Sequence, residues 1–383
     1  MRTIFKTDYD QDIRLFKHAG YYWSYGTLVL LVLLAPLAVG SYLQSQIVFV
    51  FIYAIVGVGL LILVGFTGQA SLGHAAFLAI GAYTAAYMQK LGVPFVFYFP
   101  LAGAIAGAVG AAVGFPALRL AGIYLVIATI AFGFIVEEVA ARWESVTNGN
   151  EGLRVKAIEV SGWMLSRDGT AFYYLCLAVL VMVILGALNI LRSPTGRAFV
   201  ALRDSETAAR SMGVNLAVYK VLAFSISAAV TGLAGCLYAH KLSFISPEMF
   251  TLLLSLEFII VILIGGISSL HGAVLGAIFV VMVDPFLTLL KDDLPHLAAG
   301  IAATLGAPAG VSSGIEETIA RVGGAAGLKG AIYGVIIVVF IIFEPYGIYG
   351  RWRKLKLYLD LFPLYKKATF RRVKTYVKSE RNR

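Results

Sequence analysis

The sequence predicts an all-α membrane protein whose chain crosses the bilayer about ten times. Of its 383 residues, 60% are hydrophobic and only 14% are charged, whereas soluble domains average about 45–50% and about 25%. Apolar runs of about eighteen or more residues recur along the chain, and each could span the hydrocarbon core as a helix. Together these observations exclude an ordinary soluble domain, a disordered chain and a nucleic-acid-binding domain.

Ten apolar stretches are expected to form the membrane-spanning helices. An even number of spans places both ends of the chain on one side of the membrane. The stretches are 27–45, 47–65, 72–89, 95–117, 121–141, 171–191, 219–239, 250–266, 270–290 and 330–349.

The distribution of positive charge orients these spans. Residues 351–383 hold twelve Lys or Arg against two acidic residues, so this tail accounts for the formal net charge of +10. Because Lys and Arg are enriched in cytoplasmic segments beside spans, we expect both termini to be cytoplasmic. With that orientation the cytoplasmic segments hold 22 of the 31 basic residues. We expect the tail to contact anionic membrane lipid rather than nucleic acid.

The resulting organisation has three parts. Residues 1–26 form a cytoplasmic segment, 27–350 form the transmembrane domain, and 351–383 form the basic cytoplasmic tail. Within the transmembrane domain, 192–220 is expected to be a cytoplasmic loop, and 142–170 and 291–329 are expected to lie outside.

A polar break interrupts the apolar pattern in GFTGQASLGHAAFLAIGAY, residues 65–83. Irregular backbone at membrane depth is tolerated only where protein or a water-filled cavity satisfies it, and interrupted helices often mark substrate paths. Gln69, Ser71 and His74 are therefore candidates to line such a path. The alternative is a hydrogen-bonded turn at the cytoplasmic surface.

Two acidic residues lie within spans. A charge at the centre of a span costs about 2.5–3.5 kcal/mol on insertion scales, so it normally faces the bundle interior. Glu257, near the middle of 250–266, is therefore either a structural partner or a fourth residue of the path. Because Asp284 also lies within a span, an ion-coupled secondary carrier is an alternative function for the chain.

The cytoplasmic loop contains GRAFVALRDSETAARSMGVNLAVYK, residues 196–220. Asp204 or Ser205 can cap a helix, Glu206 suits its first turn, and Gly213 can end it. This pattern predicts a short surface helix between two spans, which a soluble partner could grip. The alternative is a plain connecting helix.

The sequence offers no enzyme site. The five histidines share no HxxxH or HExxH spacing, and GFTGQAS at 65–71 lacks the GK[ST] ending of a phosphate loop. We therefore expect no catalytic residue, metal or cofactor on this chain, and a membrane enzyme is disfavoured.

Residues 45–290 resemble the permeases of branched-chain amino acid ABC importers, specifically the LivM-like subunit. The segments that carry the resemblance are GQASLGHAAFLAIGAYTAA (68–86), LAGIYLVIATIAF (120–132), SVTNGNEGL (145–153), SPTGRAFVALRDSETAARSMGVN (193–215), GLAGCLYAHKLSFISPEMF (232–250) and GGISSLHGAVLGA (265–277).

The resemblance implies an ABC importer permease fold and a role for the cytoplasmic loop. In this family the loop helix carries a form of the EAA motif, which docks in a groove of the ATPase subunit. Ala208, Ala209 and Gly213 match A-A-x3-G, whereas Glu206 lies one position earlier than in the standard motif. The implied coupling residues are Arg203, Asp204, Glu206, Ala208, Ala209 and Gly213.

The resemblance also implies partners and a substrate class. The partners are a homologous second permease subunit (LivH-like), two ATP-binding subunits (LivG-like and LivF-like) that hold ATP and Mg, and a periplasmic substrate-binding protein. Such a complex would carry branched-chain amino acids across the bacterial inner membrane by alternating access. Related permeases carry urea, amides or aromatic acids, so the sequence leaves the substrate open.

Overall fold

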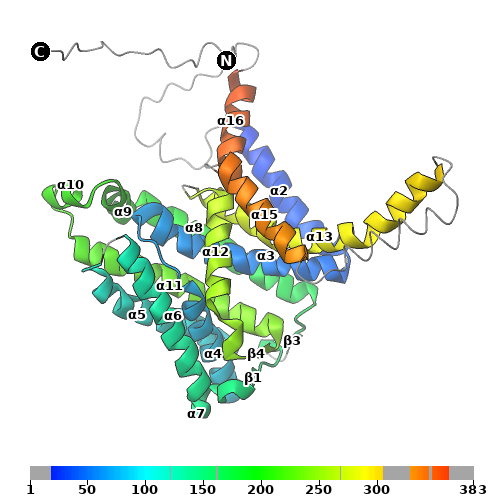
Figure 1. Ribbon diagram of the computed structural model, residues 1–383. Helices are drawn as coiled ribbons and strands as arrows, with labels where there is room; N and C mark the ends of the chain where they lie inside the picture. Colours follow the sequence, from blue (N-terminus) through cyan, green and yellow to red (C-terminus); the bar gives the residue numbers. More distant parts are fainter. Residues whose placement is uncertain are drawn as a thin grey trace, which may run out of the picture.

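The computed structural model describes residues 19–120, 122–160, 163–267, 269–304, 328–344 and 347–361. Helices form most of this part of the chain (Figure 1). They are α2 (Ala19–Ala38), α3 (Ser41–Leu60), α4 (His74–Lys90), α5 (Phe95–Ala117), α6 (Ile123–Arg142), α8 (Thr170–Arg192), α9 (Pro194–Asp204), α10 (Glu206–Ser211), α11 (Leu216–Leu242), α12 (Leu252–Gly265), α13 (Leu270–Thr304), α15 (Leu328–Phe343) and α16 (Gly347–Leu361). Shorter helical turns are η1 (Leu61–Phe66), α7 (Glu144–Thr147), η2 (Gly149–Glu151) and η3 (Pro247–Met249).

Each of the ten predicted apolar stretches is helical over most of its length. In the described part of the chain, seven helices are long and apolar enough to cross a membrane. The structure therefore shows a polytopic helical protein, while the full count of ten spans stays a prediction. The helices that meet the criteria are α3 with η1, α5, α6, α8, α11, α12 with η3, and α13 up to Thr288.

Four short strands add to the predicted all-α fold. β1 (Leu153–Arg154) pairs antiparallel with β4 (Phe244–Ile245), and β2 (Ile158–Val160) pairs antiparallel with β3 (Trp163–Leu165). Strands of two or three residues are too short to produce a recognisable alternation of apolar and polar residues. The all-α prediction is thus incomplete for the segment 142–170, which carries three of the strands.

Residues 291–329 also differ from expectation. The sequence predicts a loop that starts at 291, but α13 continues as a helix through Lys291 and Asp292 to Thr304. Figure 1 shows this end of α13 projecting from the other helices. A charged run marks the end of an apolar stretch, but it does not end this helix, which continues even through Pro295 and Gly300. Residues 305–327 lie outside the described residues.

The bundle has two ends that differ in structure. We call the end that carries α9 and α10 the helical face, and the end that carries β1–β4 the strand face (Figure 1). At the helical face, the carbonyl of Gly65 accepts a hydrogen bond from Arg203, which precedes α10. A Cβ at Gly65 would lie 2.2 Å from the carbonyl oxygen of Ile267, so the chain just before α13 lies at the same face.

Helices α2 and α16 both contact the start of α13 at the helical face. His271, in the first turn of α13, lies 2.7 Å from the hydroxyl of Tyr25 of α2 through its Nε2 atom. The ring of Tyr349 of α16 stacks on His271 with a centroid distance of 5.6 Å. The start of α2 and the start of α16 therefore lie on the same side of the bundle as α9 and α10.

The helix α11 forms the centre of the bundle and packs against α3, α4 and α5. Small residues allow these helices to approach closely. A Cβ at Gly235 of α11 would lie 2.1 Å from the carbonyl oxygen of Leu78, and a Cβ at Gly110 of α5 would lie 2.3 Å from the Cβ of Ala228. Helix α11 is thus held by direct backbone contacts to its neighbours.

Two helices, α4 and α12, begin inside the bundle instead of at either face. The ring of His74, the first residue of α4, lies 2.8 Å from the hydroxyl of Ser227. Ser227 follows the start of α11 by about 16 Å at a rise of 1.5 Å per residue. The amide of Ala75 donates to Ser255 in the first turn of α12, at 2.9 Å. The starts of α4 and α12 therefore meet at mid-depth in the bundle.

Candidate functional site

The polar break predicted from the sequence is an irregular segment, Thr67–Gly73, that leads from the helical face to the start of α4. Gly68 has a φ of +72°, which permits the sharp turn after η1. The amide of Leu72 donates to the hydroxyl of Thr129 of α6 at 3.0 Å. A side chain of a neighbouring helix thus forms a hydrogen bond with a backbone group of this segment that has no partner within a helix.

His74 is fixed by two serine hydroxyls. Its Nδ1 atom lies 3.1 Å from the hydroxyl of Ser71, and its Nε2 atom lies 2.8 Å from the hydroxyl of Ser227. The side chains of His74 and Ser71 are each 1% exposed. Because a buried polar group needs a hydrogen-bond partner, this arrangement stabilises the junction of α4 and α11.

The other two residues of the predicted path are placed differently. Gln69 is buried and its amide nitrogen donates to Thr67, while its Oε1 atom has no partner among the described residues. Glu257 is half-buried and accepts a hydrogen bond from the hydroxyl of Tyr53 at 3.0 Å. Two residues along a helix turn the side chain by about 200°, so Glu257 faces away from Ser255 and the α4 junction.

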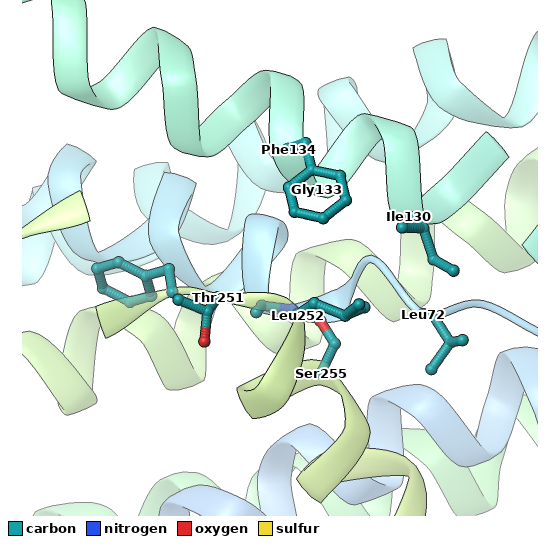
Figure 2. Close-up of a pocket in the computed structure, with 9 residues that line it drawn as sticks. Leu72, Ile130, Gly133, Phe134, Thr251, Leu252 and Ser255 are labelled. Carbon is teal, nitrogen blue, oxygen red and sulfur yellow. Dashed lines mark hydrogen bonds between the residues drawn. The ribbon is translucent and has the colours of Figure 1, made fainter. Parts of the chain in front are cut away.

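A small pocket lies where α4 and α12 begin. Its volume is about 10 Å³, enough for roughly one water molecule. Figure 2 shows Leu72, Thr251 and Ser255 on one side of it, and Ile130, Gly133 and Phe134 of α6 on the other. Ser71, His74, Gln69 and Glu257 do not line this pocket. The role of those four residues in a substrate path therefore stays a prediction, and Thr251 is a polar lining residue that the sequence did not indicate.

At the helical face, α9 and α10 form a bent pair of helices. Ser205, not Asp204, is the N-cap of α10, because its hydroxyl accepts from the amide of Ala208. At the other end the amide of Gly213 donates to Arg210, and the amide of Val214 donates to Ala209. This pair of bonds, with a φ of +83° at Gly213, is a Schellman motif. The predicted N-cap at Ser205 and the predicted helix end at Gly213 are therefore both confirmed.

The alanine pair of α10 has one buried and one exposed member. Ala209 is 3% exposed and packs against the bundle, whereas Ala208 is exposed. Met212, the residue before Gly213, is 86% exposed. A methionine side chain adapts easily to a partner surface. The outer surface of α10, formed by Ala208 and Met212, is thus available for an interaction, and sequence reasoning missed Met212.

Two polar contacts hold this pair of helices on the bundle. Arg203 donates to the carbonyl of Gly65 in η1 at 3.2 Å and also pairs with the exposed Asp204. Glu206 forms an ion pair with Lys220 of α11, with a distance of 2.7 Å between Oε1 and Nζ. The sequence did not indicate Lys220, because a lysine at the edge of a span normally extends its amine to the interface.

The chain matches a family model described as the permease component of the branched-chain amino acid transport system, over residues 42–305. The chain belongs to this family. The family consists of transport permeases, and the seven candidate spans make this member a multi-pass membrane protein, a class that in bacteria lies in the inner membrane.

Individual relatives of this permease carry more specific names. It is 37% identical over 255 residues to a high-affinity branched-chain amino acid transport system permease protein LivM of Salmonella typhimurium, and 38% identical over 255 residues to the LivM of Escherichia coli. Each match covers 60% of this chain and 60% of the relative. An autoinducer 2 import system permease protein LsrC of an Enterobacter species is 35% identical over 121 residues, 30% of this chain and 35% of the relative. No solved structure is significantly similar to the chain.

Proposed function

We propose that this chain is a transmembrane subunit of an ATP-binding cassette importer that moves branched-chain amino acids into the cytoplasm. The observation that carries the proposal is the capped helix α10, which is fixed to the bundle and presents Ala208 and Met212 outward. A short rigid helix between two spans suits a soluble ATPase as its point of attachment. Family membership and the names of the two LivM relatives support the substrate class.

In this proposal the helical face is cytoplasmic and the strand face is periplasmic. The concentration of Lys and Arg in 192–220 and 351–383 supports that orientation. The segments 1–26 and 351–383 are then cytoplasmic, 27–350 is the transmembrane domain with about ten spans, and 142–170 and 291–329 lie outside. The contacts of Tyr25 and Tyr349 with His271 are consistent with termini on one side.

The complex would contain a second, homologous permease subunit (LivH-like), two ATP-binding subunits (LivG-like and LivF-like) and a periplasmic binding protein. ATP and Mg would be held by the ATP-binding subunits. The binding protein would dock at the strand face. Residues Arg203, Asp204, Glu206, Ala208, Ala209 and Gly213 would form or position the surface that meets an ATPase.

The substrate would pass beside α6. This helix buries only three of its side chains within the chain, namely Leu125, Thr129 and Ala140. Its remaining surface is free to meet a second permease subunit or lipid. The pocket between α6 and the starts of α4 and α12 would open toward that interface. The path would then lie between the two permease subunits and pass Thr251. The predicted path residues Gln69, Ser71, His74 and Glu257 lie outside the lining of this pocket.

Uptake of labelled leucine tests the proposal directly. Cells with and without this chain are compared before and after ATP depletion, and unlabelled valine, urea and benzoate are added as competitors. We expect leucine uptake that needs both the chain and ATP and that valine inhibits. If cells without the chain lose urea or benzoate uptake while leucine uptake is unchanged, the chain would still be an ABC permease, but for a different substrate.

An ion-coupled carrier is the second mechanism to be tested, because Glu257 is an ionisable group inside a span. Glu257→Gln removes the charge but keeps an oxygen that can accept the bond from Tyr53. For the ABC importer we expect uptake to stay within about twofold of the original rate, since no proton or sodium ion need bind there. Uptake that survives ATP depletion and stops with an uncoupler would favour the carrier.

A further inference from the structure

Lys220 is a buried cation at the start of a membrane helix. Only 7% of its side chain is exposed, while that of Glu206, its partner on α10, is 46% exposed. The two residues come from different elements, since α10 ends at Ser211 and α11 begins at Leu216. Burying an ammonium group is strongly unfavourable unless it is paired. The contact with Glu206 therefore fixes where α10 lies relative to α11.

This ion pair differs from the other charged contact of the same loop. Arg203 pairs with its direct neighbour Asp204, and both side chains are more than a third exposed. An exposed pair between neighbours contributes little and holds no two elements together. The Glu206–Lys220 pair is mostly shielded from water on the lysine side and joins two helices. It is the charged connection between α10 and the bundle within the described residues.

Helix α11 continues this connection into the bundle. Two turns beyond Lys220, the hydroxyl of Ser227 binds the ring of His74 at the start of α4. Further along, backbone contacts at Gly235 leave no space for α11 to slide independently of α4. A displacement of the start of α11 therefore reaches the mid-depth junction where α4, α12 and the pocket of Figure 2 meet.

We propose that Lys220 is a positioning residue for transport, which transmits movement of α10 to α11 through its ion pair with Glu206. The proposal rests on the function proposed above, in which an ATPase moves α10. Without the pair, the ATPase can still bind the outer surface of α10, formed by Ala208 and Met212. The movement of α10 is then no longer passed on to α11 and α4. Loss of Lys220 thus separates ATP hydrolysis from transport.

The test uses the complete complex in vesicles and measures substrate uptake and ATP hydrolysis together. Lys220→Met keeps the length and apolar stem of the side chain and removes its charge. We expect copurification of the ATPases to be unchanged and the ratio of uptake to ATP hydrolysis to fall by about tenfold. Glu206→Gln should lower the ratio similarly, and the double variant should be no worse than either single variant, because the two residues act as one pair.

A matched control removes a second buried lysine pair from the far end of the same helix. Lys241 is 6% exposed and pairs with Asp168 at 2.8 Å. Lys241→Met is expected to leave the ratio of uptake to hydrolysis unchanged, because Lys241 is buried and lies at the end of α11 farthest from α10. Melting temperatures of all variants show whether each one is folded.

The outcomes separate this inference from the proposed function. An unchanged ratio in folded Lys220→Met, or additive effects in the double variant, would overturn the inference. An equal fall of the ratio in Lys241→Met would also overturn it. Loss of any buried lysine pair of α11 would then lower the ratio, whether or not that pair contacts α10. An original complex that binds no ATPase and shows no ATP-dependent uptake would contradict the proposed function itself.

Discussion

Gly81 of α4 and Gly232 of α11 meet backbone against backbone. A Cβ built on Gly81 would lie 2.1 Å from the carbonyl oxygen of Gly232, well inside the distance at which real atoms pack. Helix α4 therefore has no room for a side chain at this crossing, and a Cβ on Gly232 would instead lie 2.4 Å from the Cβ of Ala106 in α5. The contact holds α4 in place although this helix begins only at mid-depth.

The first prediction concerns this crossing. Gly81→Val should lower the free energy of unfolding by about 1–3 kcal/mol, since an overpacked core must shift its backbone. Gly186→Ala on α8 is the control, because a Cβ there meets nothing within 4 Å. Thermal unfolding in detergent measures both variants. Equal melting temperatures for the two variants would mean that α4 and α11 can move apart at this crossing without loss of stability.

The second prediction concerns the serine and histidine junction. Ser227→Ala removes the partner of the Nε2 atom of His74 and leaves a buried ring nitrogen unpaired. The expected loss of stability is about 1–3 kcal/mol. The amount of folded permease should fall, while the KM for uptake by the remaining protein should stay the same. A changed KM with unchanged stability would instead place His74 in the substrate path.

The third prediction concerns the outer surface of α10. Met212→Asp places a charge on a side chain that is 86% exposed, so it should change the free energy of unfolding by less than about 0.5 kcal/mol. If an ATPase covers this residue, the charge should abolish copurification of the ATPases. Met212→Leu keeps an apolar side chain and should retain them. Full copurification with the aspartate variant would mean that the ATPases dock at another surface of the chain.

The fourth prediction uses the end of α10. Gly213 has a φ of +83°, and a Cβ there would meet nothing within 4 Å, so a side chain is disfavoured by the backbone alone. Gly213→Val should weaken the Schellman motif by about 1–2 kcal/mol and loosen α10. Asparagine adopts this conformation more readily. Copurification should therefore fall for Gly213→Val and persist for Gly213→Asn. The same result for both would rule out the backbone explanation.

Hydropathy predicted where the long apolar helices lie, and seven of those in the described part of the chain could span a membrane, because a span needs a long apolar stretch whatever surrounds it. The caps of α10 were also predictable, since Ser205 and Gly213 act through bonds within a few residues. The mid-depth start of α12 was not predictable, because it depends on the bond between Ser255 and Ala75 of a distant helix. The burial of Lys220 was missed for the same reason: its partner lies on another element.

The short length of α4 also affects how the protein is made. Helix α4 has 17 residues, about 26 Å at 1.5 Å per residue, and is shorter than the roughly 30 Å hydrocarbon core. The preceding stretch of α3 and η1 has 26 residues and a mean hydropathy of 3.1. During synthesis the strongly apolar α3 can enter the membrane by itself. The contacts of α4 with Ser227 and Gly232 form only after α11 has been synthesised, so a nascent chain that ends before α11 would hold α4 without them.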